Sequence, residues 1–376
     1  MCSSNRAGWM LAGWVSTTAA LGQAQPAWRA MPGLNGEGRT LLVTSGSEAG
    51  GNGLPALWLG GDFSHVGGVA TGRVAKLSVG AGGGTWTTTG GAFNYSVAAL
   101  CEHDNGSGPK VYVGGSFSLA TPQGGLACVA AFDGSTWSTL PGGYALTWCN
   151  SLWSYQFPGE AARLLVSGTP SAGNNYARAL GPNGWEDAGG TFITVVDAAR
   201  MHNDGGGLEL FTANGTFNGT NKFNGVRRAT LGGNCAPAPQ WMVPMGEGPS
   251  RRLVVGGATS FAGGVQVAGV ASWNGTAWNG LGGTGWGLFR ANGGTGTAHA
   301  GVLWDDGSGE KLWVGGQFVQ VGGNTAALRV PAANIACWDG VAWSVPSAGG
   351  ITGVPNMGAY RNGAETMVVF DFDGPG

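Results

Sequence analysis

One phrase recurs seven times along this chain and limits what the chain can fold into: a short apolar segment, followed in the clearest copies by Gly-Gly and then Phe. These copies read LWLGGDF at 57–63, VYVGGSF at 111–117 and LWVGGQF at 312–318, and weaker copies begin at residues 164, 210, 253 and 367. Gly60 and Gly114 lie 54 residues apart, and the 142 residues from Gly114 to Gly256 hold three units of about 47. A repeat near 50 residues is in the range of β-propeller blades, so the phrase predicts a propeller.

A second phrase follows the first in several units and consists of an aromatic residue, Asp-Gly or Asn-Gly, and a Trp. It reads FDGSTW at 132–137, WNGTAW at 273–278 and WDGVAW at 338–343. Asp-Gly and Asn-Gly tolerate the positive φ that both central positions of a type I′ turn require, which predicts a hairpin. A further strand, such as 97–100, then leads into a polar turn. Each unit therefore holds about four short antiparallel strands, as a propeller blade does.

The composition excludes several other classes of protein. Gly accounts for 76 of the 376 residues without a Gly-X-Y period, and 43% of the residues are hydrophobic, which excludes collagen and disorder. The abundant Gly, with only 10% charged residues, also argues against a helical bundle. The net charge of −2 supplies no basic field, so we expect neither a nucleic-acid partner nor attraction to a membrane surface. We expect the diglycines where backbones approach closely, and one Trp per unit where neighbouring blades pack.

The repeats predict an all-β fold with seven four-stranded blades, or alternatively six. Some blades are expected to be incomplete, because the unit from Trp241 to Arg251 is short. Residues 27–33 match the last strand of a unit, so we expect an N-terminal strand to complete the C-terminal blade and remove the free sheet edge. Residues 25–376 would then form a single β-propeller domain. The seven Trp residues that mark the units are Trp28, Trp86, Trp137, Trp185, Trp241, Trp278 and Trp343.

Residues 1–24 have the pattern of a secretory signal peptide. Arg6 precedes a weakly apolar run of 15 residues, Ala7 to Leu21, and Gly22-Gln23-Ala24 forms a small-x-small cleavage pattern. The run is shorter than the roughly 20 residues that a spanning helix needs, and no later segment approaches that length. We therefore expect a secreted protein, extracellular or at the cell surface, with no membrane span.

Five cysteines follow the predicted signal peptide. Their odd number, their wide spacing and the lack of a C-x-x-C motif favour neither a zinc site nor a dense disulfide framework. Cys101 and Cys149 hold matching places in successive repeats, so a bridge between neighbouring units is one open pairing. The five are Cys101, Cys128, Cys149, Cys235 and Cys337.

Taken together, the two phrases resemble the kelch-type propellers and, more closely, the secreted repeats of the Rax2-like cortical-marker family, which occur in exported bacterial proteins. The resemblance covers residues 27–372 and implies the architecture, but it implies little about function because propellers host binding, scaffolding and catalysis. In some relatives a calcium-binding Asp-rich segment follows the propeller. Residues 371–376 resemble its first few positions, but no further ligand follows them, and no calcium is assigned.

No catalytic, cofactor-binding or metal-binding residue is assigned from the sequence. Asp133-Gly134 departs from a sialidase Asp box, in which one residue separates Asp from Gly, and no G-x-S-x-G, H-E-x-x-H or P-loop motif occurs. The Asp-rich turns are better explained as solvated hairpin turns than as calcium sites. The residues considered were His65, His103, His202 and His299, the turn residues Asp104, Asp204, Asp305 and Asp306, and the acids Glu102, Asp197 and Glu209.

The first functional hypothesis is a monomeric, non-catalytic binding or scaffold propeller that engages a polysaccharide, a cell-envelope component or a protein through its loop faces. The alternative is a secreted carbohydrate-active enzyme, a hydrolase or a kelch-type oxidase, with its site on the propeller axis. Carboxylates converging at 5 to 10 Å in one axial pocket would favour the alternative.

Overall fold

The structure is a computed structural model that describes residues 33–346, with gaps at 48–52, 81–82, 92, 122–123, 141–144, 174, 189, 191, 193, 215–218, 282–284 and 306–308, and also the strands at 11–14 and 27–30. The described residues are almost entirely β-strand and turn. Two single turns of 3-10 helix, Gly248–Ser250 and Ala326–Leu328, are the exceptions among them. The prediction of an all-β fold is confirmed.

Six four-stranded antiparallel sheets make up most of the described chain, and in each one the strands pair in chain order. Sheet 1 consists of β3 (Glu37–Thr44), β4 (Ala56–Asp62), β7 (Val74–Gly80) and β8 (Gly83–Thr88). Sheet 2 consists of β9 (Val97–Asp104), β10 (Pro109–Thr121), β11 (Gly124–Phe132) and β12 (Trp137–Thr139). Sheet 3 consists of β13 (Leu146–Tyr155), β14 (Arg163–Pro170), β15 (Ala177–Gly181) and β16 (Gly184–Glu186). Sheet 4 consists of β17 (Val196–Asn203), β18 (Leu208–Asn214), β19 (Gly219–Phe223) and β20 (Arg228–Thr230). Sheet 5 consists of β22 (Trp241–Met245), β23 (Arg252–Gly256), β26 (Val270–Trp273) and β27 (Trp278–Asn279). Sheet 6 consists of β29 (Thr297–Asp305), β30 (Glu310–Gln317), β33 (Ile335–Trp338) and β34 (Trp343–Ser344).

Smaller sheets are formed by the connecting segments. They are β1 (Leu11–Trp14) with β2 (Ala27–Ala30), β5 (His65–Val66) with β6 (Val69–Ala70), β21 (Cys235–Ala236) with β24 (Phe261–Ala262) and β25 (Val265–Gln266), and β28 (Gly285–Phe289) with β31 (Gln320–Gly323) and β32 (Arg329–Pro331).

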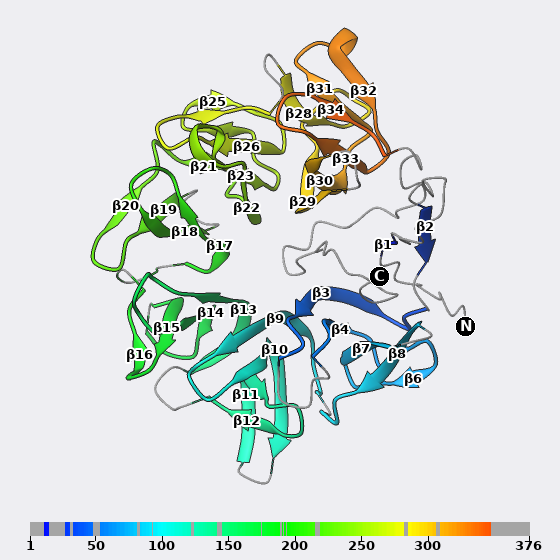
Figure 1. Ribbon diagram of the computed structural model, residues 1–376, viewed down its shortest axis with the longest axis vertical. Helices are drawn as coiled ribbons and strands as arrows, with labels where there is room; N and C mark the ends of the chain where they lie inside the picture. The colour runs from blue at the N-terminus through cyan, green and yellow to red at the C-terminus, as the bar shows by residue number, and fades with distance from the viewer. Residues whose placement is uncertain are drawn as a thin grey trace.

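The six sheets are arranged around a central space, with the first strand of each sheet innermost (Figure 1). Apolar side chains fill the layers between neighbouring sheets; Trp58 of sheet 1, for example, belongs to the same buried cluster as Val111 and Phe132 of sheet 2. The arrangement is consistent with a propeller-like fold, and the arc between β29 and β3 holds no four-stranded sheet among the described residues (Figure 1).

Six sheets are described, which equals the alternative blade count. Six of the seven copies of the first phrase form the second strands of these sheets, and the seventh copy, at 367–370, lies outside the described residues. The described partner of β2 is β1, so the predicted closing of the last blade by an N-terminal strand is not among the described pairings.

The prediction that Trp241 is a unit marker equivalent to Trp137 and Trp278 is wrong. Trp241 begins β22, the first strand of sheet 5, and the preceding sheet ends in β20, where Arg228 occupies the place that Trp holds elsewhere. The apparently short unit from Trp241 to Arg251 is therefore the first strand and first turn of a complete sheet. A Trp can pack between two sheets from either an inner or an outer strand. The spacing of Trp residues along the sequence therefore does not by itself give the number of units.

The Trp residues of the outermost strands tie neighbouring sheets together, as the sequence predicted. The indole N–H of Trp137 donates to the Thr89 carbonyl of the preceding sheet at 3.0 Å, and Trp343 donates to the Leu281 carbonyl at the same distance. Trp278 makes the corresponding bond to the Leu231 carbonyl at 3.4 Å. In all three cases the acceptor follows the last strand of the preceding sheet, so one contact repeats around the ring.

The diglycines are explained by a β-bulge that recurs in the first strands. In five sheets one residue of the first strand is skipped in the pairing with the second strand, next to the diglycine or its equivalent. A Cβ on Gly114 would lie 2.6 Å from the Cys149 sulfur of the next sheet, and a Cβ on Gly115 would overlap the Ser96 carbonyl oxygen of its own sheet. The first Gly therefore permits sheet-to-sheet packing, and the second accommodates the bulge.

Candidate functional site: the central cavity

The first strands of all six sheets enclose a cavity of about 940 Å³. Each strand contributes four to six consecutive residues, among them 40–43 of β3, 98–102 of β9 and 196–201 of β17. The six sheets share one topology, five are aligned by their bulges, and the fifth sheet is aligned by its pairing with the diglycine at 256–257, so we compare equivalent residues of the six strands. The cavity can therefore be described level by level.

The first level is the ring of bulge positions near the beginnings of the first strands. The skipped residues are Arg39, Ala98, Asn150, Asp197 and His299, and Gln240 holds the corresponding position just before β22. Arg39 is engaged in ion pairs with Glu37 and Asp62 and does not line the cavity. The other polar members, Asn150, Asp197, Gln240 and His299, do line it. No hydrogen bond from the described residues reaches the carboxamides of Asn150 and Gln240, which are accessible to a ligand.

The second level lies three residues further along the strands and is mostly apolar. Its six members, one from each sheet, are Leu42, Cys101, Trp153, Arg200, Val243 and Val302. Arg200 is the one charged residue among them. Its Nε donates to the Met242 carbonyl at 3.3 Å, and no described group accepts a hydrogen bond from its two Nη atoms. Although solvent reaches the side chain through the cavity, burial by the surrounding protein lowers the pKa of the guanidinium.

Sequence reasoning missed Arg200, but a signal was present. When the first strands are aligned on the diglycine phrase, Arg200 is the only charged residue in a column of Leu, Cys, Trp and Val. To find this column one must know how each first strand pairs with the second, because the bulge shifts that pairing by one residue.

The structure does not gather the predicted carboxylates. Glu102 and Asp197 line the cavity four positions apart in aligned strands, which at about 3.3 Å per residue separates them by about 13 Å along the cavity. Glu102 accepts hydrogen bonds from Ser45 N at 2.9 Å and Ser45 Oγ at 2.8 Å and so connects sheets 1 and 2. Glu209 pairs with Lys222 outside the cavity lining. The spacing that would favour a hydrolase is not formed by this pair.

The histidines are also dispersed. His65 is exposed in β5 beside Ser64 and Asn35. His103 and His202 occupy the same place in sheets 2 and 4, and neither lines the cavity. The Nδ1 of His103 lies 2.9 Å from Ser154 Oγ of sheet 3, and His202 packs edge-on against Phe211 of its own sheet. His299 lies at the bulge of β29.

Acidification between pH 6.5 and 4 is expected to destabilise the fold through His103 and His202. Burial lowers the pKa of each imidazole to about 4, and the unfolded chain protonates near pH 6.5, so within this range the unfolded state binds more protons and stability falls as pH falls. The loss amounts to about 3 kcal/mol for each histidine by pH 4. Urea unfolding at several pH values measures it, and the double variant His103→Gln, His202→Gln should show a flatter dependence; an equal slope would contradict the assignment.

The Asp-rich turns divide into two kinds. Asp104 Oδ1 accepts from the backbone N–H groups of Gly106 and Gly108, and Asp305 Oδ1 accepts from that of Gly309, as hairpin turns require. Asn203 makes the equivalent bonds in sheet 4. The expectation of a solvated turn is wrong for Asp204, whose side chain is only 3% exposed. Asp306 lies outside the described residues.

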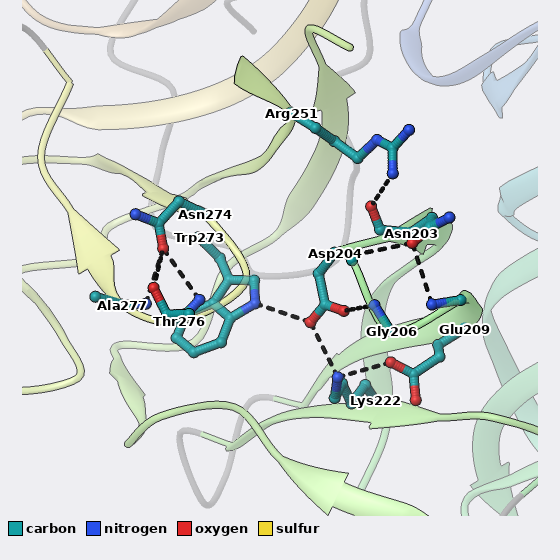
Figure 2. A network of polar contacts seen from close by, with 12 residues as sticks. Asn203, Asp204, Gly206, Glu209, Lys222, Arg251, Trp273, Asn274, Thr276 and Ala277 are labelled. Atoms are coloured by element: carbon teal, nitrogen blue, oxygen red, sulfur yellow. Dashed lines mark hydrogen bonds and ion pairs between the residues drawn. The ribbon is translucent and has the colours of Figure 1, made fainter. Parts of the chain in front are cut away.

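Asp204 belongs to a polar network that joins sheets 4 and 5 (Figure 2). Its Oδ2 accepts from Lys222 Nζ at 3.0 Å and from the Trp273 indole N–H of the next sheet at 3.2 Å. Lys222 also pairs with Glu209 at 2.7 Å, and Arg251 of sheet 5 donates to the Asn203 carbonyl at 3.1 Å. Every charge in the network has a protein partner, so its role is structural.

All five described cysteines are buried free thiols. The Cys101–Cys149 bridge that the sequence left open is therefore absent from the described structure. Cys128 donates to the Leu146 carbonyl of the next sheet at 3.2 Å, and Cys149 faces Gly114. Burial raises the pKa of the Cys101 and Cys235 thiols to about 12, so both are neutral at physiological pH.

In the part of the chain that the structure describes, no three His, Cys, Asp or Glu side chains come together as metal ligands would. Within the same residues, no helix combines the length and the apolar character needed to cross a bilayer. No family model and no curated protein matches the sequence, so the resemblance to kelch-type and Rax2-like repeats stays a prediction.

Proposed function

We propose that the chain is a secreted, non-catalytic propeller that binds a polysaccharide. Residues 1–24 serve as its signal peptide in this proposal. The observation that carries the binding role is the wall of the central cavity, where carboxamides from Asn150 and Gln240 and the half-buried indole of Trp153 are available to a ligand. Carboxamides that hydrogen-bond hydroxyl groups and a hydrophobic ring that covers the face of a sugar are suited to carbohydrate chains.

We further propose that the ring closes with a seventh blade, formed by residues 353–372 and the strand at 27–30. Its support is the seventh copy of the strand phrase at 367–370 and the arc without a described sheet between β29 and β3 (Figure 1).

The test of the binding role is incubation of residues 25–376 with soluble and insoluble polysaccharides, with mass spectrometry of the supernatant. We expect at least one polysaccharide to deplete the protein without releasing products, and the Asn150→Ala, Gln240→Ala double variant to be depleted less. A matched control is Asn105→Ala, Gln156→Ala, which removes the same groups from exposed loops. Released products would overturn the non-catalytic role in favour of the enzyme alternative. A protein that no polysaccharide depletes would overturn polysaccharide binding.

A further inference from the structure

A cation without an ion-pair partner among the described residues lies in the wall of the central cavity and points to the charge of the ligand. Arg200 lines the cavity from β17; the adjacent first strands contribute Trp153 and Val243 at the same level, and Cys101 interacts with Arg200 electrostatically. None of these carries a negative charge. The Arg200 side chain is exposed to the cavity, so its charge is accessible to an anionic ligand.

The carboxylates of the cavity wall do not compensate for Arg200. Asp197 precedes Arg200 by three residues in the same strand, about 10 Å along it. Glu102 is held by Ser45 on the side of sheet 1, away from sheet 4. The salt bridges of the described residues include Arg39, Arg73, Arg163 and Arg178 but not Arg200.

The orientation of the guanidinium leaves its outer edge for a ligand. The Nε donates to the Met242 carbonyl of sheet 5, so this edge of the group faces the protein. The two Nη atoms then present several N–H donors that no described group uses. A planar fork of this kind matches a carboxylate or another oxyanion, and such charge-assisted bonds are about twice as strong as neutral ones.

Resting on the proposed polysaccharide binding, we propose that Arg200 makes the central cavity selective for an anionic sugar chain, with the Nη edge bound to its carboxylate or sulfate group. Trp153, from the adjacent strand at the same depth, covers the apolar face of that sugar. The carboxamides of Asn150 and Gln240 bind hydroxyl groups at the bulge level, about 10 Å further along the cavity.

The test is calorimetric titration of the full chain, at constant ionic strength, with a hexamer of galacturonic acid and with the same hexamer fully methyl-esterified. The ester keeps the hydroxyl groups and removes the charge. We expect the acid to bind at least about tenfold more tightly than the ester, and Arg200→Gln to weaken binding of the acid about tenfold to a hundredfold without affecting the ester. Dextran sulfate against dextran distinguishes sulfate from carboxylate as the group recognised.

Arg227→Gln is the matched control, because it removes the same charge from an exposed turn of the same sheet. Equal affinity for acid and ester, or an unchanged affinity in Arg200→Gln, would overturn the anion site while leaving polysaccharide binding intact. If no sugar binds, inorganic sulfate is the remaining probe: a rise in melting temperature that Arg200→Gln abolishes would support the anion site alone, and no rise would overturn it.

An acid outside the described residues is the alternative partner for Arg200, and three such acids lie near the C-terminus of the sequence. The variant Glu365→Gln, Asp371→Asn, Asp373→Asn tests this. Unchanged affinity for the acid hexamer supports the ligand as the partner. Tighter binding in this variant, together with loss of stability, would instead assign the guanidinium to the chain itself.

Discussion

Substitution of Gly115 by Ala is expected to destabilise the protein by about 3 kcal/mol or more, or to prevent folding. A Cβ at this position would overlap the Ser96 carbonyl oxygen and lie 2.9 Å from Cδ1 of Phe117. Backbone atoms cannot rotate away as a flexible side chain could, so β9 would have to leave β10 at the bulge. Urea unfolding followed by Trp fluorescence measures the effect.

Gly206→Ala is the control for the intrinsic effect of replacing Gly with Ala. Gly206 is exposed, and a Cβ there would meet nothing nearer than Asp204 Oδ1 at 3.6 Å. We expect a change within about 0.5 kcal/mol. If Gly115→Ala unfolded at the same urea concentration as this control, close backbone approach would not be the reason for the second Gly of the phrase.

Substitution of Lys222 by Met is expected to cost about 3 to 5 kcal/mol at pH 7. The ammonium group lies between Asp204 and Glu209, whose side chains are 3% and 11% exposed, so the variant leaves two neighbouring carboxylates poorly solvated and without their cation. The Trp273 indole N–H still bonds Asp204, which keeps the sheets in contact but does not neutralise the charge.

The pH dependence of this loss distinguishes electrostatics from packing. In the wild type, burial acts to raise the pKa of Asp204, but the hydrogen bonds from Lys222 and Trp273 outweigh it and lower the pKa, so the pair contributes stability above the unfolded pKa near 4. Without Lys222, burial and the neighbouring carboxylate raise the pKa of Asp204, so the variant loses stability as pH rises from 4 to 7.

The difference between Lys222→Met and wild type should therefore shrink toward pH 4. Denaturant midpoints at pH 4.5 and 7 measure it. Lys110→Met is the matched control, because Lys110 makes no ion pair among the described residues. A difference that stays equal at both pH values would show that Lys222 acts by packing alone.

The repeat phrases predicted the strands well because their signals are local. Six copies of the first phrase are second strands, and FDGSTW, WNGTAW and WDGVAW each join a third strand to a fourth. A turn depends on the φ values of two adjacent residues, and a strand depends on the pattern of its own side chains. Both can therefore be inferred without knowing what lies across the sheet.

The sites could not be predicted in the same way, because they join different sheets. Asp204 and Trp273 are 69 residues apart, and Ser45 and Glu102 are 57 apart. Asp104 is a solvated turn residue, whereas Asp204 is buried and connects two sheets. The difference depends on whether the next sheet presents an indole N–H to the carboxylate. The two turns look alike in sequence.

By itself, the sequence determined the class of fold, the repeat and the strand order within each unit, since short-range patterning and turn chemistry specify these. Only the tertiary structure decided which residues meet. It placed Trp241 in an inner strand, left Cys101 and Cys149 as separate thiols, and brought Arg200 into the cavity wall without a counterion among the described residues. The physical reason is that these contacts join different sheets. In five of the six first strands a bulge also shifts the register, and with it the choice of side chains that face the cavity.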